Sequence, residues 1–131
     1  MNASRTLIIC ACAALLAACA SPRPRESPEH AERMRVAGES YTACITAEAE
    51  KDAKNPVRAE DIAIAAHGRC WTQWNAYGTA THVNFTHGTR TPEELQYARD
   101  KTEAHLREFE IEARRSLVEW VVQRNQPGSS R

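Results

Sequence analysis

Apolar residues recur at helical spacing along three long stretches of this chain, residues 29–54, 56–77 and 91–124. In each stretch they return every three or four positions, which is the period of one face of an α-helix. Strand-forming residues are sparse, whereas Ala, Glu and Arg are abundant, and this composition also favours helix. The positions on the predicted buried faces are Met34, Val36, Ala37, Tyr41, Cys44, Ile45 and Glu48 in the first stretch, Ala59, Ile62, Ala66, Cys70, Trp74 and Tyr77 in the second, and Leu95, Ala98, Thr102, Leu106, Phe109, Ala113, Leu117 and Trp120 in the third.

Local signals mark where the helices begin and end. Asn55-Pro56 interrupts the first pattern, and it suits the start of the second because Asn caps a helix and Pro fits its first position. Thr91-Pro92-Glu93-Glu94 combines an N-cap, a proline in the first turn and a capping-box glutamate. Residues 78–90 contain two glycines and lack a helical period, so we predict a loop. The result is an all-α domain over residues 29–124, a three-helix up-down-up bundle, with a flexible tail at 125–131.

The segment before the first helix has the layout of a secretory signal peptide. One positive charge, Arg5, is followed by the uncharged run of residues 6–18, which ends in small side chains. A helix that spans a membrane needs about 20 apolar residues, so the run is short for a permanent span. An N-terminal anchor helix that is never cleaved is the alternative.

Leu16-Ala17-Ala18-Cys19, at the end of this run, resembles the lipobox of bacterial lipoproteins. The resemblance implies that residues 1–18 are removed, and that Cys19 carries a thioether-linked diacylglyceryl group and an acylated amino terminus. Asp after the cysteine would suggest retention in the inner membrane, so Ala20 resembles the outer-membrane pattern. Residues 19–28, rich in proline, then form an extended tether. We therefore expect a protein that is lipid-anchored in the outer membrane and faces the periplasm.

The charge balance gives no support for a nucleic-acid partner. The chain has 17 Lys and Arg against 17 Asp and Glu, and removal of Arg5 with the leader leaves 16 against 17. A protein that binds nucleic acid normally carries a basic stripe. The partners that we expect are the membrane, through the lipid, and another protein.

Cys44 and Cys70 are predicted to form a disulfide. Each lies 13 residues from Val57, beside the turn, so the two stand at the same level of an antiparallel hairpin. Both also fall on the apolar face of their helix, and an exported protein meets an oxidising compartment. Free buried thiols and a reactive redox pair are the alternatives, although the chain lacks a C-x-x-C motif.

His82 and His87, five residues apart in the predicted loop, are the metal-ligand candidates. A zinc site needs three or four ligands at recognisable spacing, and no such motif surrounds them, so solvent-exposed loop histidines are the alternative. The chain also lacks a nucleophile elbow and a glycine-rich phosphate loop. We expect no cofactor and no enzymatic activity.

The third helix is predicted to extend beyond the second. About 33 residues at 1.5 Å each reach roughly 50 Å, whereas about 22 residues reach roughly 33 Å. The overhanging end carries Leu117, Val118, Trp120, Val121 and Val122. An exposed apolar surface of this kind indicates a partner, and Leu117, Trp120 and Val121 are the expected contact residues. The alternative is that the first or the second helix bends, or that the turn between them is longer, so that these residues are covered internally.

Taken together, the sequence favours a small periplasmic lipoprotein that acts by protein–protein contact, as an envelope-structure or accessory module. The end of the third helix is then the expected contact with a protein partner or with a second copy. The alternative function is the binding of a metal or a small ligand by the loop that contains His82 and His87.

Overall fold

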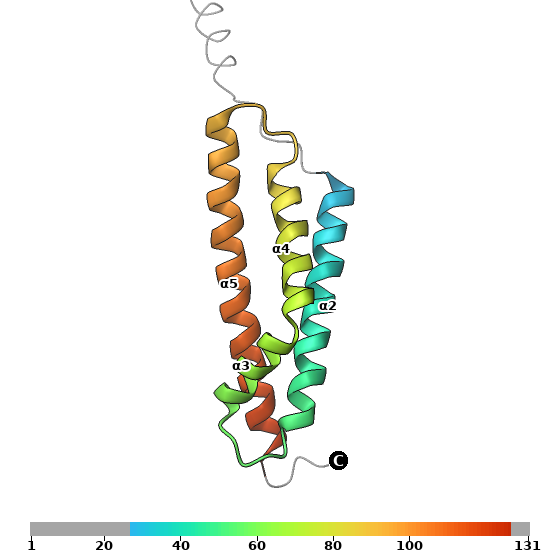
Figure 1. The fold of residues 1–131 in the computed structure, drawn as a ribbon, viewed down its shortest axis with the longest axis vertical. Coiled ribbons are helices and arrows are strands. Elements are labelled where there is room, and N and C mark those ends of the chain that lie inside the picture. The colour runs from blue at the N-terminus through green and yellow to red at the C-terminus, as the bar shows by residue number, and fades with distance from the viewer. Residues whose placement is uncertain (1–26, 127–131) are drawn as a thin grey trace, which may run out of the picture.

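The computed structural model describes residues 27–126, and over this range the protein is all-helical (Figure 1). The expected all-α class is confirmed, but these residues fold into four helices rather than three. The leader, Cys19 and residues 127–131 lie outside the described range. The helices are α2 (Pro28–Asp52), α3 (Ala59–Arg69), α4 (Trp71–Thr86) and α5 (Pro92–Arg124).

The second predicted helix is wrong as a single element, because it breaks at Cys70. The backbone N–H of Cys70 donates to the carbonyls of Ala66 and His67, which ends α3. The carbonyl of Cys70 accepts the N–H of Trp74, which begins α4. Gly68, a poor helix former, stands two residues before the break. As a result of the break, α3 turns away from the line of α4 (Figure 1).

The predicted loop over residues 78–90 is also wrong for most of its length, because α4 continues to Thr86. Buried Tyr77 and Thr81 hold this part of α4 against its neighbours. Threonine hydroxyls in α4 also donate to the carbonyl four residues earlier, as Thr81 does to Tyr77 at 2.8 Å. These bonds satisfy the hydroxyls without stabilising the helix, so it is the burial of Tyr77 and Thr81 that outweighs the weak helix propensity of Gly and Thr.

The start of α5 is confirmed as a capping box. The hydroxyl of Thr91 accepts the backbone N–H of Glu94 at 3.1 Å. The Glu94 carboxylate accepts the N–H of Thr91 at 3.2 Å in return. Gly88, with a φ of +77°, turns the chain between α4 and this cap. The true connection between the two helices is therefore short.

Three of the helices, α2, α4 and α5, stand side by side, and α3 lies across the lower end of α5 (Figure 1). α4 runs antiparallel to α2 and α5, which run in the same direction (Figure 1). Within residues 27–126 there is no helix both long and apolar enough to cross a membrane.

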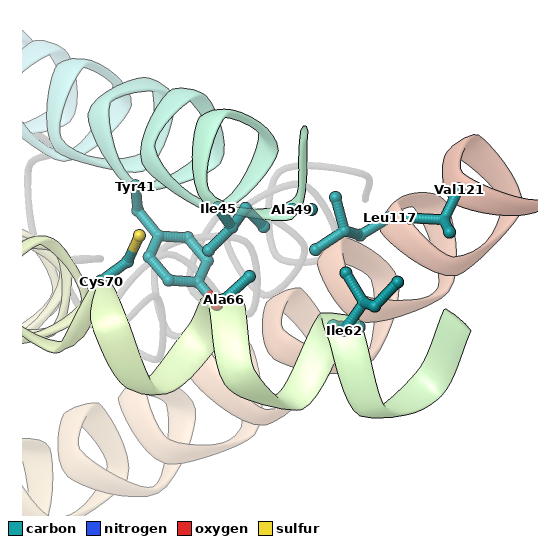
Figure 2. Close-up of a cluster of buried hydrophobic side chains, with 9 residues drawn as sticks. Tyr41, Ile45, Ala49, Ile62, Ala66, Cys70, Leu117 and Val121 are labelled. Carbon is teal, nitrogen blue, oxygen red and sulfur yellow. The ribbon is translucent and has the colours of Figure 1, made fainter. Parts of the chain in front are cut away.

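The main apolar cluster lies where α2, α3 and α5 meet (Figure 2). Leu117 and Val121 of α5 are only 4% and 1% exposed, so the predicted overhang of α5 is wrong. The break at Cys70 allows α3 to cover this end of α5, which is the internal covering considered as the alternative. The buried residues of the cluster are Tyr41, Ile45, Ala49, Ile62, Ala63, Ala66, Cys70, Leu117 and Val121.

Further up the bundle, α2 and α4 approach each other closely at Gly38. A Cβ atom at this position would lie 3.1 Å from Cε2 of Tyr77, tighter than ordinary van der Waals contact. Gly38 is buried, whereas Val36, which the sequence placed on the buried face, is 50% exposed. The buried face of α2 is therefore rotated slightly from the predicted one.

Candidate functional site

The predicted disulfide between Cys44 and Cys70 is confirmed. It joins α2 to the break between α3 and α4, with the two Cα atoms 6.0 Å apart. Cys70 is fully buried. Beside the bridge, Arg69 pairs with Glu48 at 3.2 Å and with Asp52, which adds ion pairs between α3 and α2. This environment indicates a structural disulfide that holds the hairpin together.

The structure separates the two histidines that the sequence placed in one loop. His82 is exposed on α4, and His87 follows the last residue of that helix. His87 packs instead against His30 in the first turn of α2, with ring centroids 4.4 Å apart and planes inclined by 75°. About one turn away on the two helices, Nδ2 of Asn84 lies 3.8 Å from Sδ of Met34.

These two contacts place His30 and Met34 of α2 opposite His87 and Asn84 of α4. Residues three or four positions apart share a helix face, so each pair presents its side chains together. Two buried atoms of the cluster, Nδ1 of His30 and Oδ1 of Asn84, have no hydrogen-bond partner among residues 27–126. A buried polar atom without a partner costs about 1–3 kcal/mol. These two atoms are therefore available to bind a ligand.

His30 and Met34 were missed as site residues by the sequence argument. Their signal was the i,i+4 spacing of two metal-ligating side chains at the start of a helix. This spacing indicates a site only because α4 extends to Thr86 and brings His87 next to His30. Within the described range, no three His, Cys, Asp or Glu residues gather in a metal-binding arrangement.

The two remaining histidines, His67 and His105, each share a hydrogen bond with a buried tyrosine. The Tyr41 hydroxyl lies 2.8 Å from Nδ1 of His67, and the Tyr77 hydroxyl lies 2.8 Å from Nε2 of His105. Burial raises the pKa of Tyr41 to about 12, with a further contribution from the Glu110 carboxylate. Burial also raises the pKa of Tyr77. Both phenols are protonated at neutral pH, so the Tyr41–His67 pair holds α2 against α3 and the Tyr77–His105 pair holds α4 against α5.

A groove runs between α2 and α5, and its floor is apolar. Its lower part, a hollow of about 370 Å³, is lined in part by Phe109, Leu117 and Trp120. It continues along α2 into a hollow of about 700 Å³, and the two hollows share Phe109, Thr42 and Thr46. α2 and α5 contact each other less than either contacts α4. This corner of the bundle is therefore open.

The α2 wall of the groove is made of small side chains and ends in charged ones. Arg35 and Glu39 stand at the upper end, where they form an ion pair, and Glu50 stands at the lower end. Glu50 pairs with Arg124 of α5 at 2.6 Å. The small residues of the wall are Gly38, Thr42, Ala43, Thr46 and Ala47.

The three predicted contact residues at the end of α5 have different environments. Trp120 is partly exposed at the groove, with the guanidinium of Arg124 5.1 Å above its ring. Leu117 forms part of the groove floor but is nearly buried, and Val121 lies in the core. Of these three residues, only Trp120 offers substantial area to a partner, and Val122, also on the predicted overhang, is 48% exposed.

Comparison with known proteins gives no further guide to function. No protein-family model, no curated protein and no solved structure matches the chain. The function must therefore be inferred from the residues and the geometry of the chain itself.

Proposed function

We propose that this protein is a lipid-anchored envelope protein that associates with a second copy of itself through the groove between α2 and α5. Support for the anchor comes from the leader, in which Leu16-Ala17-Ala18-Cys19 resembles a lipobox. Support for the self-association comes from the open corner of the bundle. The groove is the observation that carries the proposal.

The shape and lining of the groove suit a helix. Small residues such as Gly38, Ala43 and Ala47 let the backbone of a partner helix approach α2 closely. Phe109 and Trp120 supply aromatic area on the opposite side, and aromatic side chains commonly dominate binding energy at interfaces. A helix that enters the groove would fill the gap between α2 and α5, and the bundle would then have four long helices.

A second copy fits because the charges of the α2 wall complement themselves in an antiparallel arrangement. Arg35 precedes Thr42 by seven residues, and Glu50 follows Ala43 by seven. When two α2 helices cross antiparallel at Thr42 and Ala43, a two-fold axis brings Arg35 of each copy to Glu50 of the other. Arg35 pairs with Glu32 and Glu39, and Glu50 pairs with Arg124; these pairs are exposed, and exposed pairs exchange at little cost.

The test is the oligomeric state of the full chain, measured by sedimentation in detergent over a range of protein concentrations. Ala43→Arg places a long charged side chain at the centre of the groove wall and should convert the dimer to a monomer. Ala104→Arg, at an exposed alanine of α5 outside the groove lining, is the matched control and should leave the dimer intact.

The charged ends of the groove allow a sharper version of this test. Arg35→Glu places like charges together and should weaken the dimer by roughly tenfold or more. The double variant Arg35→Glu, Glu50→Arg restores opposite charges and should recover most of the affinity. A protein that is monomeric at every concentration, or a dimer that Ala43→Arg leaves unchanged, would contradict the proposal.

The anchor is tested separately, by labelling cells with radioactive palmitate. The wild-type protein should carry label and lack residues 1–18, whereas Cys19→Ser should carry none and retain its leader. The matched control is Cys12→Ser, which changes a cysteine inside the leader and should leave labelling intact. Unlabelled wild-type protein recovered from the cytosol with its leader attached would refute the anchor.

A further inference from the structure

Four side chains at the upper end of α2 and α4 form a cluster that lies outside the groove lining. His30 and Met34 come from α2, and Asn84 and His87 come from the end of α4. The rings of His30 and His87 pack with centroids 4.4 Å apart, and Nδ2 of Asn84 lies 3.8 Å from Sδ of Met34. Two helices thus place a pair of packed imidazoles about one helical turn from a thioether.

The donor atoms of this cluster suit a soft metal ion. Nδ1 of His30 is buried and has no hydrogen-bond partner among residues 27–126, so its lone pair is free when the proton sits on Nε2. Thioether sulfur selects Cu(I), and imidazole binds copper well. Magnesium and calcium require several oxygen ligands, and a structural zinc site normally has four nitrogen, sulfur or carboxylate ligands. In the described part of the chain no such set of His, Cys, Asp or Glu surrounds the cluster.

The carboxyl end of α4 favours a cation. Asn84 lies in the last turn of α4 and His87 caps it, where free backbone carbonyls form the negative end of the helix dipole. His30 lies at the positive end of α2, which opposes a cation. The charge of Arg33, one turn on, is balanced by its ion pair with Glu29 at 2.5 Å.

We propose that the protein binds one Cu(I) ion, or its chemical analogue Ag(I), between α2 and α4. The ligands are Nδ1 of His30, Sδ of Met34 and an imidazole nitrogen of His87, with the free Oδ1 of Asn84 beside them. Binding involves no change of oxidation state. This site does not depend on self-association through the groove, so either proposal stands if the other fails.

The test is competition for Cu(I) between the full chain and bicinchoninate, without oxygen and with ascorbate as the reductant. Thiols of Cys10, Cys12 and Cys19 are alkylated first, because free thiolates bind Cu(I) strongly. One ion per chain is expected. Met34→Leu, which conserves size, should lower the affinity by at least roughly tenfold, and His30→Ala by about 100-fold. His82→Ala, at an exposed histidine of α4, is the matched control and should bind as the wild type does.

A second measurement uses the wild-type protein, so its result does not depend on whether the variants fold. Met1 and Met34 are the two methionines of the chain, and Met1 belongs to the predicted leader, so the methyl signal of Met34 is readily assigned by NMR. This signal should shift on addition of one equivalent of Ag(I). Absence of the shift, Cu(I) binding that Met34→Leu leaves unchanged, or tighter binding of Zn(II) than of Cu(I) would overturn the proposal.

Discussion

Two buried phenol–imidazole pairs limit the stability of the fold at alkaline pH. Tyr41 and Tyr77 are 2% and 3% exposed, and their hydroxyls reach His67 and His105. Ionisation of either phenol would place a negative charge in the interior of the bundle. The raised pKa values show that the folded state resists this ionisation.

Stability should fall as the pH rises above 10. An unfolded tyrosine ionises near pH 10, whereas folded Tyr41 ionises at about 12. The unfolded state therefore loses its proton first, and stability present in full below pH 10 is lost towards pH 12. At pH 11 the loss from Tyr41 is about 1.4 kcal/mol. Urea unfolding at pH 9, 10 and 11 measures this loss of stability. Tyr41→Phe should reduce the dependence of stability on pH, whereas Tyr97→Phe, at an exposed tyrosine, should leave it unchanged.

Two glycines should respond to substitution in opposite directions. Nothing lies within 4 Å of a Cβ built on Gly68, so Gly68→Ala should raise the free energy of unfolding by up to about 1 kcal/mol. A Cβ on Gly38 meets Tyr77 at 3.1 Å, so the larger Gly38→Val should lower it by about 1–3 kcal/mol. Urea unfolding of both variants is the measurement. Stabilisation by Gly38→Val would mean that α2 and α4 are less closely packed than described.

At the scale of elements, the sequence predicted the features that residues of recognisable type and spacing determine. The capping box at Thr91 fixed the start of α5, and the equal distances of Cys44 and Cys70 from the turn identified the disulfide. The extent of α4 was not predictable, because its last residues form a helix through tertiary contacts of Tyr77 and Thr81. Because the full length of α4 was not predicted, the cluster proposed to bind Cu(I) was missed. Because the break at Cys70 was not predicted, the covering of α5 by α3 was missed as well.

Reduction of the disulfide should destabilise the bundle. The bridge closes a loop with a sequence separation of 26 residues, for which the chain-entropy relation gives about 3.5 kcal/mol. Thermal unfolding with and without a phosphine reductant is the measurement, and the melting temperature should fall on reduction. The double variant Cys44→Ala, Cys70→Ala should match the reduced protein and show no response to the reductant. A response in that variant would assign the effect to another cysteine.

At the scale of the whole molecule, the proposed dimer restricts how the protein meets a membrane. α2 has 25 residues and is about 37 Å long, so an antiparallel pair holds its two amino termini at opposite ends. The chain from Cys19 to Pro28 reaches at most about 30 Å when fully extended. Both lipid anchors can therefore enter one bilayer only when the helices lie along its surface.

Shortening the tether should therefore weaken the dimer on membranes but not in detergent. Deletion of residues 22–25 reduces the maximum reach to about 17 Å. The fraction of dimer on lipid vesicles, measured by energy transfer between labelled copies, should fall several-fold. Replacement of the same four residues by Gly and Ser keeps the length and should preserve the dimer. An equal loss in detergent would show that residues 22–25 act in the interface itself.

The position of the disulfide also has an optical consequence. Trp71 is adjacent to Cys70 in the chain, and Trp74 donates its backbone N–H to the Cys70 carbonyl, so the backbone of two of the three tryptophans lies close to the bridge. Disulfides quench the fluorescence of nearby indoles by accepting an electron from the excited state. The oxidised protein should therefore emit mainly from Trp120, and opening of the bridge should appear as a rise in emission from the other two rings.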